Sequence, residues 1–405
     1  MWFSVCAYSQ ETLNAMFYNV FKFPTSLPQN RELILRDILD EYQPDLFMIC
    51  ELVNENGADL ILNTSLQNQT DTFARAVFTP DLTNPSDPLQ TMVFYNTRKL
   101  TLVNQQTLPT VYRDINHYSF ELNVEANDPI YLEVFVAHLK SSTGPANRQM
   151  RFDMVEQVTQ ELQNLTQPDT YVLFSGDFNF YNSSEIGYQQ ILNPANAIVM
   201  IDPINAPGSW QDNASFSYLH TQSTRFSNSG FGGGANAGAS GGLDDRFDFI
   251  FVGDDVMQGT NKLKYIAGTY KALGNDGLHY NKSLLASPTN TSVPFNVLQA
   301  LYYMSDHLPI VMKVYIDEAV SVDEKTSKES WRGYFSNNKF VFKSDKVEQQ
   351  INVQLIDILG KPIQKKFYQN QHSFEFDYNH LTNGLYFVKV WNNHQLQKTY
   401  RIVKQ

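Results

Sequence analysis

The chain has 405 residues, of which 42% are hydrophobic and 13% aromatic, so its composition is that of a globular protein and not of a disordered one. Its length favours one large domain or two domains. No apolar run approaches the roughly 20 residues that cross a bilayer. Two cysteines, Cys6 and Cys50, are too few for a disulfide framework. These features predict a soluble protein.

Charge is distributed unevenly along the chain. Residues 331–405 hold 11 Lys and Arg against 5 Asp and Glu, a net charge of +6. The 19 basic and 37 acidic residues in 1–330 leave a net charge of −18 there. A body this acidic repels polyanions at long range. A nucleic-acid substrate would therefore need a local basic patch, a metal ion or high salt.

The N-terminal residues have some features of a secretory signal. Residues 2–6 are apolar, and Ala7-Tyr8-Ser9 has the small-x-small form of a cleavage site, after which Gln10 would begin the mature chain. A basic region does not precede the apolar run. We therefore expect residues 1–11 to be the remnant of a signal peptide whose start is missing.

Hydrophobic patterns predict a mixed α/β domain in the first three quarters of the chain. Apolar spacing of three and four residues predicts helices over residues 30–42 and 147–165. Short apolar or alternating runs predict strands over residues 15–20, 45–50, 92–95, 131–139, 171–174, 246–252 and 310–316. Strands separated by amphipathic helices, together with antiparallel-looking strands, indicate an α/β (α+β) domain.

The rest of the chain divides into three kinds of segment. Residues 228–242 are rich in glycine and predict a flexible insertion, but they lack the strand and helix that flank a phosphate-binding loop. Residues 317–330 are small and charged, which indicates a linker. After it, short strands are expected in a small all-β sandwich at residues 339–343, 350–356, 373–378, 384–391 and 398–403.

Polar residues recur where the predicted strands of the first domain begin or end. They are Asn19, Glu51, His138, Asp177, Asn179, Asp248, Asp306 and His307. Carboxylate and amide oxygens suit Mg²⁺, and imidazoles beside carboxylates can move protons or donate to a phosphate. The sequence has no His-Glu-x-x-His or Cys-x-x-Cys zinc pattern, and the step Ser175-Gly176-Asp177 is not the Gly-x-Ser-x-Gly turn of a serine hydrolase. This set indicates metal-assisted hydrolysis of phosphoesters.

The motifs around these residues resemble, in order, those of the endonuclease/exonuclease/phosphatase family. They are Tyr18-Asn19-Val20, Ile49-Cys50-Glu51, Ala137-His138-Leu139-Lys140, Ser175-Gly176-Asp177-Phe178-Asn179, Phe247-Asp248-Phe249-Ile250 and Ser305-Asp306-His307-Leu308-Pro309. The last two motifs are specific, whereas the first two are weak alone. The resemblance covers about residues 12–316. It implies a four-layer sandwich of two mixed β-sheets flanked by helices.

The resemblance also implies roles for individual residues. Glu51, Asn19 and Asp306 would hold Mg²⁺, with Mn²⁺ or Ca²⁺ as possible replacements. Asp177 and Asn179 would orient the attacking water and the phosphate, and His307, aligned by Asp248, would act as a base or stabilise charge. His138 would donate to a phosphate oxygen. Further expected contacts to the substrate are Tyr112, which would face the phosphate, and Arg113, Arg148 and His279.

The C-terminal residues resemble the type IX secretion sorting domain of Bacteroidetes. The similar stretches are Asp357-Ile358-Leu359-Gly360-Lys361, residues 381–390 and the basic end at residues 401–404. The Asn-Pro step usual at the start of that domain is missing, so the start is placed near Trp331. A generic β-sandwich binding module is the alternative. We expect residues 331–405 to address the protein to the type IX machinery, which predicts a secreted or surface-attached protein.

Three functions follow from these patterns. The first is a secreted Mg²⁺-dependent phosphodiesterase, foremost an endonuclease on extracellular DNA or RNA. The second keeps this chemistry but acts on a small or lipid phosphodiester, as sphingomyelinases do. The third is a surface binding protein without catalysis. The acidic body argues against a polyanionic substrate, and the apparently full set of strand-end ligands argues against a non-catalytic protein.

Overall fold

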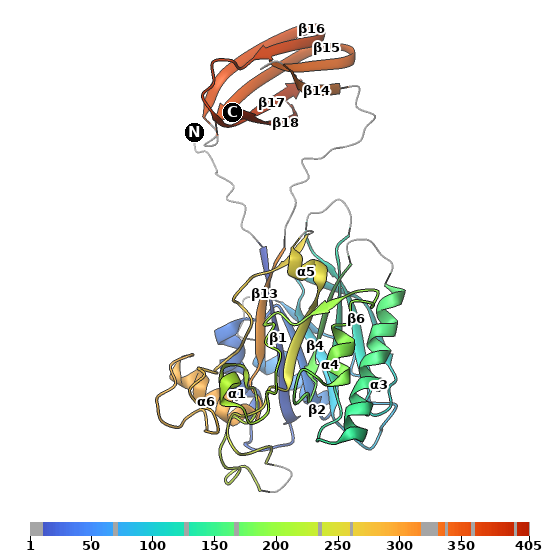
Figure 1. Cartoon of the computed structure of the whole chain (residues 1–405), viewed down its shortest axis with the longest axis vertical. Helices are drawn as coiled ribbons and strands as arrows, with labels where there is room; N and C mark the ends of the chain where they lie inside the picture. Colours follow the sequence, from blue (N-terminus) through green and yellow to red (C-terminus); the bar gives the residue numbers. More distant parts are fainter. Residues whose placement is uncertain are drawn as a thin grey trace. The chain divides into compact units, whose positions relative to one another are not determined.

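The computed structural model describes residues 11–67, 72–124, 129–165, 170–233, 237–259, 262–316, 331–336, 339–357, 361–392 and 395–404. The chain divides into two compact units, with the division between residues 319 and 320 (Figure 1). The expected signal remnant, apart from Glu11, and the whole expected linker lie outside the described residues. The proposed domain boundaries at residues 11, 316 and 330 stay predictions.

Two mixed sheets form the centre of the first unit. One has the strand order β11-β13-β1-β2-β4-β3, with β12 also paired to β13, and the other has the order β5-β6-β7-β8-β10-β9. The strands of the first sheet are β1 (Glu11–Phe23), β2 (Leu46–Leu52), β3 (Phe73–Arg75), β4 (Gln90–Asn96), β11 (Leu263–Tyr265), β12 (Lys271–Ala272) and β13 (Ile310–Ile316). Those of the second are β5 (Leu100–Leu108), β6 (Ile115–Leu122), β7 (Tyr131–His138), β8 (Thr170–Asp177), β9 (Met200–Ile201) and β10 (Asp248–Gly253).

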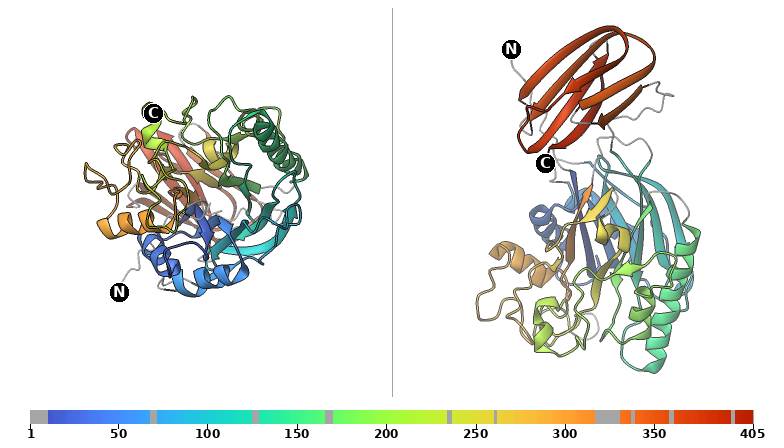
Figure 2. Two further views of the ribbon diagram at one scale, coloured as in Figure 1. Left: turned by 90° about the horizontal axis from the view of Figure 1, so that it is seen from below. Right: turned by 45° about the horizontal axis from the view of Figure 1, so that its top comes forward.

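Helices cover the outer face of each sheet, which completes the expected four layers (Figures 1 and 2). The helices are α1 (Arg31–Tyr42), α2 (Glu55–Leu60), α3 (Pro145–Glu161), α4 (Ile186–Ile191), α5 (Asp254–Gln258) and α6 (Phe295–Met304). Shorter helical turns are Ile61–Ser65, Leu162–Asn164 and Ala214–Leu219. Apolar residues of α1 and α6 share one core with both sheets, while α3 and α4 pack on the second sheet in a separate cluster.

The parallel pairs β1/β2 and β7/β8 bring distant parts of the chain to one end of the unit. His138 at the end of β7 lies beside Asp177 at the end of β8 in the parallel ladder. Asp248 begins β10 and pairs with Asp177 from the antiparallel side. Because carboxyl ends of parallel strands meet at one edge, three of the polar residues expected at strand ends become neighbours.

The C-terminal unit is a small antiparallel β domain. Its strands are β14 (Trp331–Ser336), β15 (Lys339–Asp357), β16 (Pro362–Asp377), β17 (Gly384–Asn392) and β18 (Gln395–Lys404). Two separate strands were expected at 339–343 and 350–356, but a single strand, β15, spans both. The polar residues between them interrupt the apolar pattern, while the backbone continues to pair with β16 through a register shift between Lys343 and Glu348.

Candidate active site

Strand alternation turns three of the polar side chains toward the space between the sheets. Val134 and Val136 of β7 belong to the core between the sheets, whereas Phe135 belongs to the cluster under the helices. Side chains two residues apart lie on the same face of a strand, so His138 points inward. Asp177 lies four residues after the core residue Leu173 on β8, and Asp248 lies two residues before the core residue Ile250 on β10. Both side chains therefore also point inward.

Irregular backbone at the ends of β1 and β2 positions Glu51. The β1/β2 ladder loses its register between Asn19 and Phe23, and the β2/β4 ladder does so between Ile49 and Leu52. Glu51 itself has a φ of 62°, a left-handed conformation that is uncommon for a residue with a long side chain. Bulges beside active sites redirect a side chain, and here the carboxylate of Glu51 reaches Asn19.

The segment before β13 is joined to the end of β1. The Ser305 hydroxyl donates to the carbonyl of Asn19 at 2.6 Å and accepts from the backbone N–H of His307 at 3.1 Å. Arg31, fully buried, donates to the carbonyls of Phe21 at 2.8 Å and Met304 at 2.9 Å. These bonds hold Asp306 and His307 beside the ends of β1 and β2.

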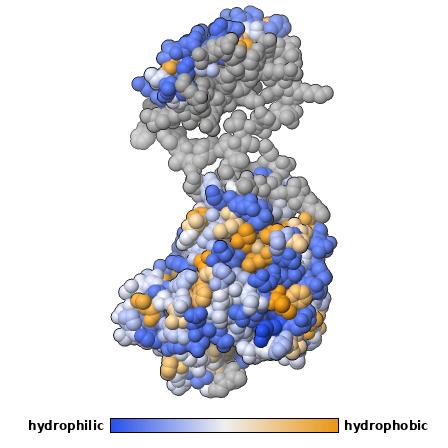
Figure 3. Space-filling view, in the orientation of Figure 1, coloured by the Kyte–Doolittle hydropathy of each residue, from blue (hydrophilic) through white to orange (hydrophobic). Residues whose placement is uncertain are grey.

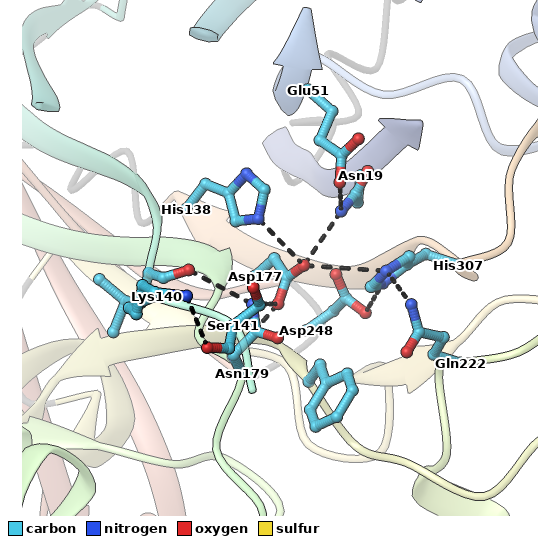
Figure 4. Close-up of polar contacts among 12 residues, drawn as sticks. Asn19, Glu51, His138, Lys140, Ser141, Asp177, Asn179, Gln222, Asp248 and His307 are labelled. Atoms are coloured by element: carbon cyan, nitrogen blue, oxygen red, sulfur yellow. Dashed lines mark hydrogen bonds and ion pairs between the residues drawn. The ribbon is translucent and has the colours of Figure 1, made fainter. Parts of the chain in front are cut away.

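Asp177 is the centre of the resulting network (Figure 4). Its Oδ2 accepts a hydrogen bond from Asn19 Nδ2 at 3.0 Å and lies 3.7 Å from Nε2 of both His138 and His307. Its Oδ1 accepts from the backbone and the side-chain amide of Asn179, at 3.1 and 2.8 Å. One carboxylate thus contacts or faces four of the residues that the sequence singled out.

Two further contacts define the site. Asn19 Nδ2 donates to Glu51 Oε1 at 3.0 Å, while its Oδ1, the expected metal ligand, accepts from the N–H of Phe21 at 3.0 Å. The side-chain amide of Asn19 therefore donates hydrogen bonds to the carboxylates of both Glu51 and Asp177. His307 Nδ1 lies 2.7 Å from Asp248 Oδ2, which is the partnership expected from the sequence motifs.

Burial and neighbouring charge shift the pKa values of these groups. Burial raises the pKa of Asp177 to about 8. Burial and then the charge of Asp306 also raise the pKa of Glu51. Burial, with Arg113 second, lowers the pKa of His138 well below its ordinary value, so this imidazole is neutral. For His307, burial opposes the charged form, but Asp248 and Asp177 outweigh it and raise its pKa well above the ordinary value.

The donor set fits a divalent cation. Ligand atoms of Glu51, His138 and Asp177 lie within 4.8 Å of one another, and all three residues are buried. Burial raises the pKa of both Glu51 and Asp177, and a cation bound between them would offset the cost of burying their negative charges. Asp306 is outside this set, but its Oδ1 is buried without a hydrogen-bond partner. Carboxylate oxygens with free lone pairs suit Mg²⁺ or Mn²⁺.

The residues expected to contact the substrate differ in their exposure and in their partners. Arg113 is buried and pairs with Asp87 at 2.6 Å, and its guanidinium also lies 4.7 Å from the ring centre of Tyr112. Arg148 is exposed near the start of α3. His279 is buried, and both of its ring nitrogens are occupied, by Asp276 at 2.8 Å and by a backbone carbonyl at 3.0 Å. The structure thus leaves His279 no free ring nitrogen for a substrate.

Two contacts of the site have no counterpart among the residues singled out from the sequence. Gln222 Nε2 lies 2.7 Å from His307 Nε2 and 3.4 Å from Asp306 Oδ2. The backbone N–H of Ala239, within the glycine-rich insertion, donates to Asp306 Oδ2 at 2.6 Å. Neither residue lies in a strand with a hydrophobic pattern, so no local signal marks them. Residues 237–242, the end of the insertion that the sequence predicts to be flexible, thus include a contact with the site.

Comparison with known protein families identifies the C-terminal unit. Residues 336–405 match the family described as a secretion system C-terminal sorting domain. The chain carries a secretion sorting domain. This match confirms the expectation that the C-terminal residues form a sorting domain, and with it the expectation that the protein is secreted or attached to the cell surface. No curated protein matches the chain. Among the described residues, none of the helices has the length and apolar character needed to cross a membrane.

Several solved structures are similar to the chain. The human Nocturnin catalytic domain with bound sulfate is 16% identical, covers 75% of this chain and 94% of its own, and has a TM-score of 0.47. A Danio rerio TDP2 complexed with a single-strand DNA product is 14% identical, with coverages of 75% and 98% and a TM-score of 0.45. An endonuclease/exonuclease/phosphatase from Beutenbergia cavernae is 11% identical, with coverages of 97% and 100% and a TM-score of 0.43.

Proposed function

We propose that residues 12–316 form a secreted, Mg²⁺-dependent phosphodiesterase whose foremost substrate is extracellular DNA or RNA. The observation that carries this proposal is the buried arrangement around Asp177. There, the buried carboxylates of Glu51 and Asp177 lie beside the imidazole of His138, and His307 is held by Asp248 next to them. Hydrolysis of a phosphodiester needs these groups: a site for a hard cation, a proton acceptor and donors to the phosphate.

Each side chain has a task that its environment favours. Asp177, whose carboxylate is buried and held by Asn19 and Asn179, can accept a proton from the attacking water. Asn179, bonded to Asp177 Oδ1, fixes the direction of that carboxylate. His138 is neutral and can donate one N–H to a phosphate oxygen. His307 carries its charge beside Asp248 and can stabilise negative charge that develops on the phosphate.

The side chains proposed to hold the cation are the carboxylates of Glu51 and Asp177. The third proposed ligand is Asp306 Oδ1, which has no hydrogen-bond partner. A bound Mg²⁺ would neutralise charge on the phosphate oxygens. The amide of Asn19 keeps the carboxylates of Glu51 and Asp177 at a fixed separation, because it donates to both at 3.0 Å.

A cavity of about 450 Å³ is relevant to the choice of substrate. It is lined by Lys22, whose backbone N–H donates to Glu51 at 3.1 Å, by the ion pair of Arg113 and Asp87, and by Val53, Pro88 and Leu89. Lys22 would hold a phosphate that neighbours the scissile one, despite the negative charge of the body. Hydrophilic residues cover most of the face of this unit that Figure 3 shows, with hydrophobic residues in smaller patches.

The same cavity favours a second candidate function. A volume of about 450 Å³ is in the range of small-molecule sites, and its mixture of apolar and cationic groups would also fit a small or lipid phosphodiester. Nicking of supercoiled plasmid and cleavage of single-stranded RNA in Mg²⁺, run beside hydrolysis of bis(p-nitrophenyl) phosphate and of sphingomyelin, separate the two. Cleavage of either nucleic acid supports the nuclease. Turnover of the small or lipid diesters without cleavage of plasmid or RNA would refute it, and no turnover of any of these substrates would refute the hydrolase.

Removal of divalent cations is expected to abolish turnover. EDTA removes the cation that Glu51 and Asp177 are proposed to hold, and with it the charge that would offset that of the phosphate. Mg²⁺ or Mn²⁺ added in excess should restore the rate, which the same plasmid or diester assay measures. Full activity after exhaustive chelation would contradict the proposed metal dependence.

Deletion of residues 331–405 is expected to leave kcat unchanged and to prevent export. The catalytic residues lie in the first unit, and residues 336–405 match a sorting domain. We propose that the type IX secretion machinery reads this domain. Activity should move from the medium or cell surface to the periplasm when the truncated chain is expressed in a host with this machinery. A truncated chain that is still exported would contradict the proposal.

A further inference from the structure

We propose that residues 222–225 and 237–242 act together as a clamp that positions Asp306 and His307. The inference rests on the proposed function, because it assigns a task to side chains that flank the same site. These two stretches, called the clamp below, include the latter part of the glycine-rich insertion, which no step of the hydrolysis uses.

The clamp contacts both members of the Asp306-His307 pair. Ala239 donates its backbone N–H to Asp306 Oδ2 at 2.6 Å, and Gln222 Nε2 lies 3.4 Å from the same oxygen. The amide nitrogen of Gln222 is also 2.7 Å from His307 Nε2. The amide of Gln222 therefore lies against both the carboxylate and the imidazole, as Figure 4 shows for the imidazole.

The backbone of the clamp is anchored on both sides. Gln222 forms isolated β-bridges with Asp245 and with His307. The Thr224 N–H donates to the carbonyl of Asp306 at 3.1 Å, and the Ser223 hydroxyl donates to the carbonyl of Ala239 at 2.8 Å. Because the two stretches are joined to each other and to residue 306, the side chain of Gln222 starts from a fixed position.

The fit between the clamp and Asp306 requires glycine at position 238. Gly238 has a φ of +79°, and a Cβ there would lie 2.8 Å from Asp306 Oδ2, 2.9 Å from Cγ and 3.0 Å from Cβ. Contacts this short force a displacement. Asp306 is buried and its Oδ2 is already bonded, so a methyl group at position 238 would move the carboxylate.

The clamp determines which oxygen of Asp306 is free. Oδ2 is occupied by the clamp, whereas Oδ1 is buried without a hydrogen-bond partner. A buried carboxylate oxygen without a partner is costly unless a ligand meets it. The geometry therefore fits a positioning role: the clamp holds Oδ2 so that Oδ1 is available to a divalent cation.

Gly238→Ala tests the clamp against a matched control, Gly230→Ala. Gly230 also has a positive φ, +95°, but no atom lies within 4 Å of the position that a methyl group would take there. Both variants therefore strain the backbone, whereas only Gly238→Ala also displaces a neighbouring side chain. Mn²⁺ binding to the full chain is measured by calorimetry, and hydrolysis of bis(p-nitrophenyl) phosphate gives kcat and KM. We expect Gly238→Ala to weaken Mn²⁺ binding about tenfold or more, as loss of a contact to a ligand does, and to lower kcat with little change in KM.

Gln222→Met is the second variant, because it keeps the length of the side chain and removes its hydrogen bonds. It should also weaken Mn²⁺ binding and lower kcat, while Gly230→Ala behaves as the wild type in both. Equal Mn²⁺ affinity in Gly238→Ala, Gln222→Met and the wild type would overturn the clamp. If the wild type binds Mn²⁺ in a manner that depends on Gly238 but hydrolyses no phosphodiester, the clamp stands and the proposed function fails.

Discussion

Asp177→Asn is expected to lower kcat on a phosphodiester about 1,000-fold, the size of effect that loss of a general base produces. Asparagine preserves the shape of the side chain but removes its negative charge. Asp177 has both oxygens in use, with Asn19 and Asn179 donating to them and two imidazoles at 3.7 Å. Loss of the charge removes the proton acceptor and one proposed cation ligand together. Single-turnover hydrolysis of the diester measures the effect, and a rate within tenfold of wild type would refute the role.

Thermal unfolding separates this loss from a folding defect. Burial raises the pKa of Asp177 to about 8, whereas the unfolded chain releases this proton near pH 4. The stabilising contribution of the bound proton is therefore complete below about pH 4 and is lost as the pH rises toward 8. Metal-free Asp177→Asn lacks this dependence, so its Tm should exceed that of the wild type at pH 8. A lower Tm would mean that the inactive variant is poorly folded.

His307→Gln is expected to lower kcat about 100-fold or more, because the imidazolium is the charge proposed to stabilise the phosphate. His307 is buried, with Nδ1 2.7 Å from Asp248 Oδ2. Glutamine fills a similar volume and remains neutral. Asp248→Asn should have a smaller effect in the same direction, since it keeps the ring but weakens the hold on its charge. The kcat of each variant in saturating Mg²⁺ measures these effects.

A matched control for His307 lies elsewhere in the same domain. His117 is also buried, with Nε2 2.6 Å from Glu133 Oε2, but it stacks on Phe135, which belongs to the cluster under α3 and α4. His117→Gln removes a buried imidazole beside a carboxylate on the face away from the site. It should lower the free energy of unfolding and preserve kcat. Equal losses of kcat in His117→Gln and His307→Gln would indicate that both act through stability.

The layers of the first unit could be predicted because their residues obey local rules. The spacing of Leu35, Ile38 and Leu39 produces the buried face of α1, and alternation along β7 produces an inner and an outer face. The hairpin of β5 and β6 was not predicted. In β5, Asn104, Gln105 and Gln106 interrupt the apolar pattern, since this strand lies at the edge of its sheet and exposes much of its length.

By itself the sequence determined which side chains lie at strand ends and that residues 331–405 resemble a sorting domain, because both depend on residues close together in the chain. Only the tertiary structure decided which partner each side chain has. Arg113 is paired with Asp87, and His279 is closed within its own loop. The contacts of Gln222 and Ala239 with Asp306 join residues 84 and 67 positions apart. Such contacts are set by how loops pack over the ends of two sheets, and no local pattern of hydrophobicity records them.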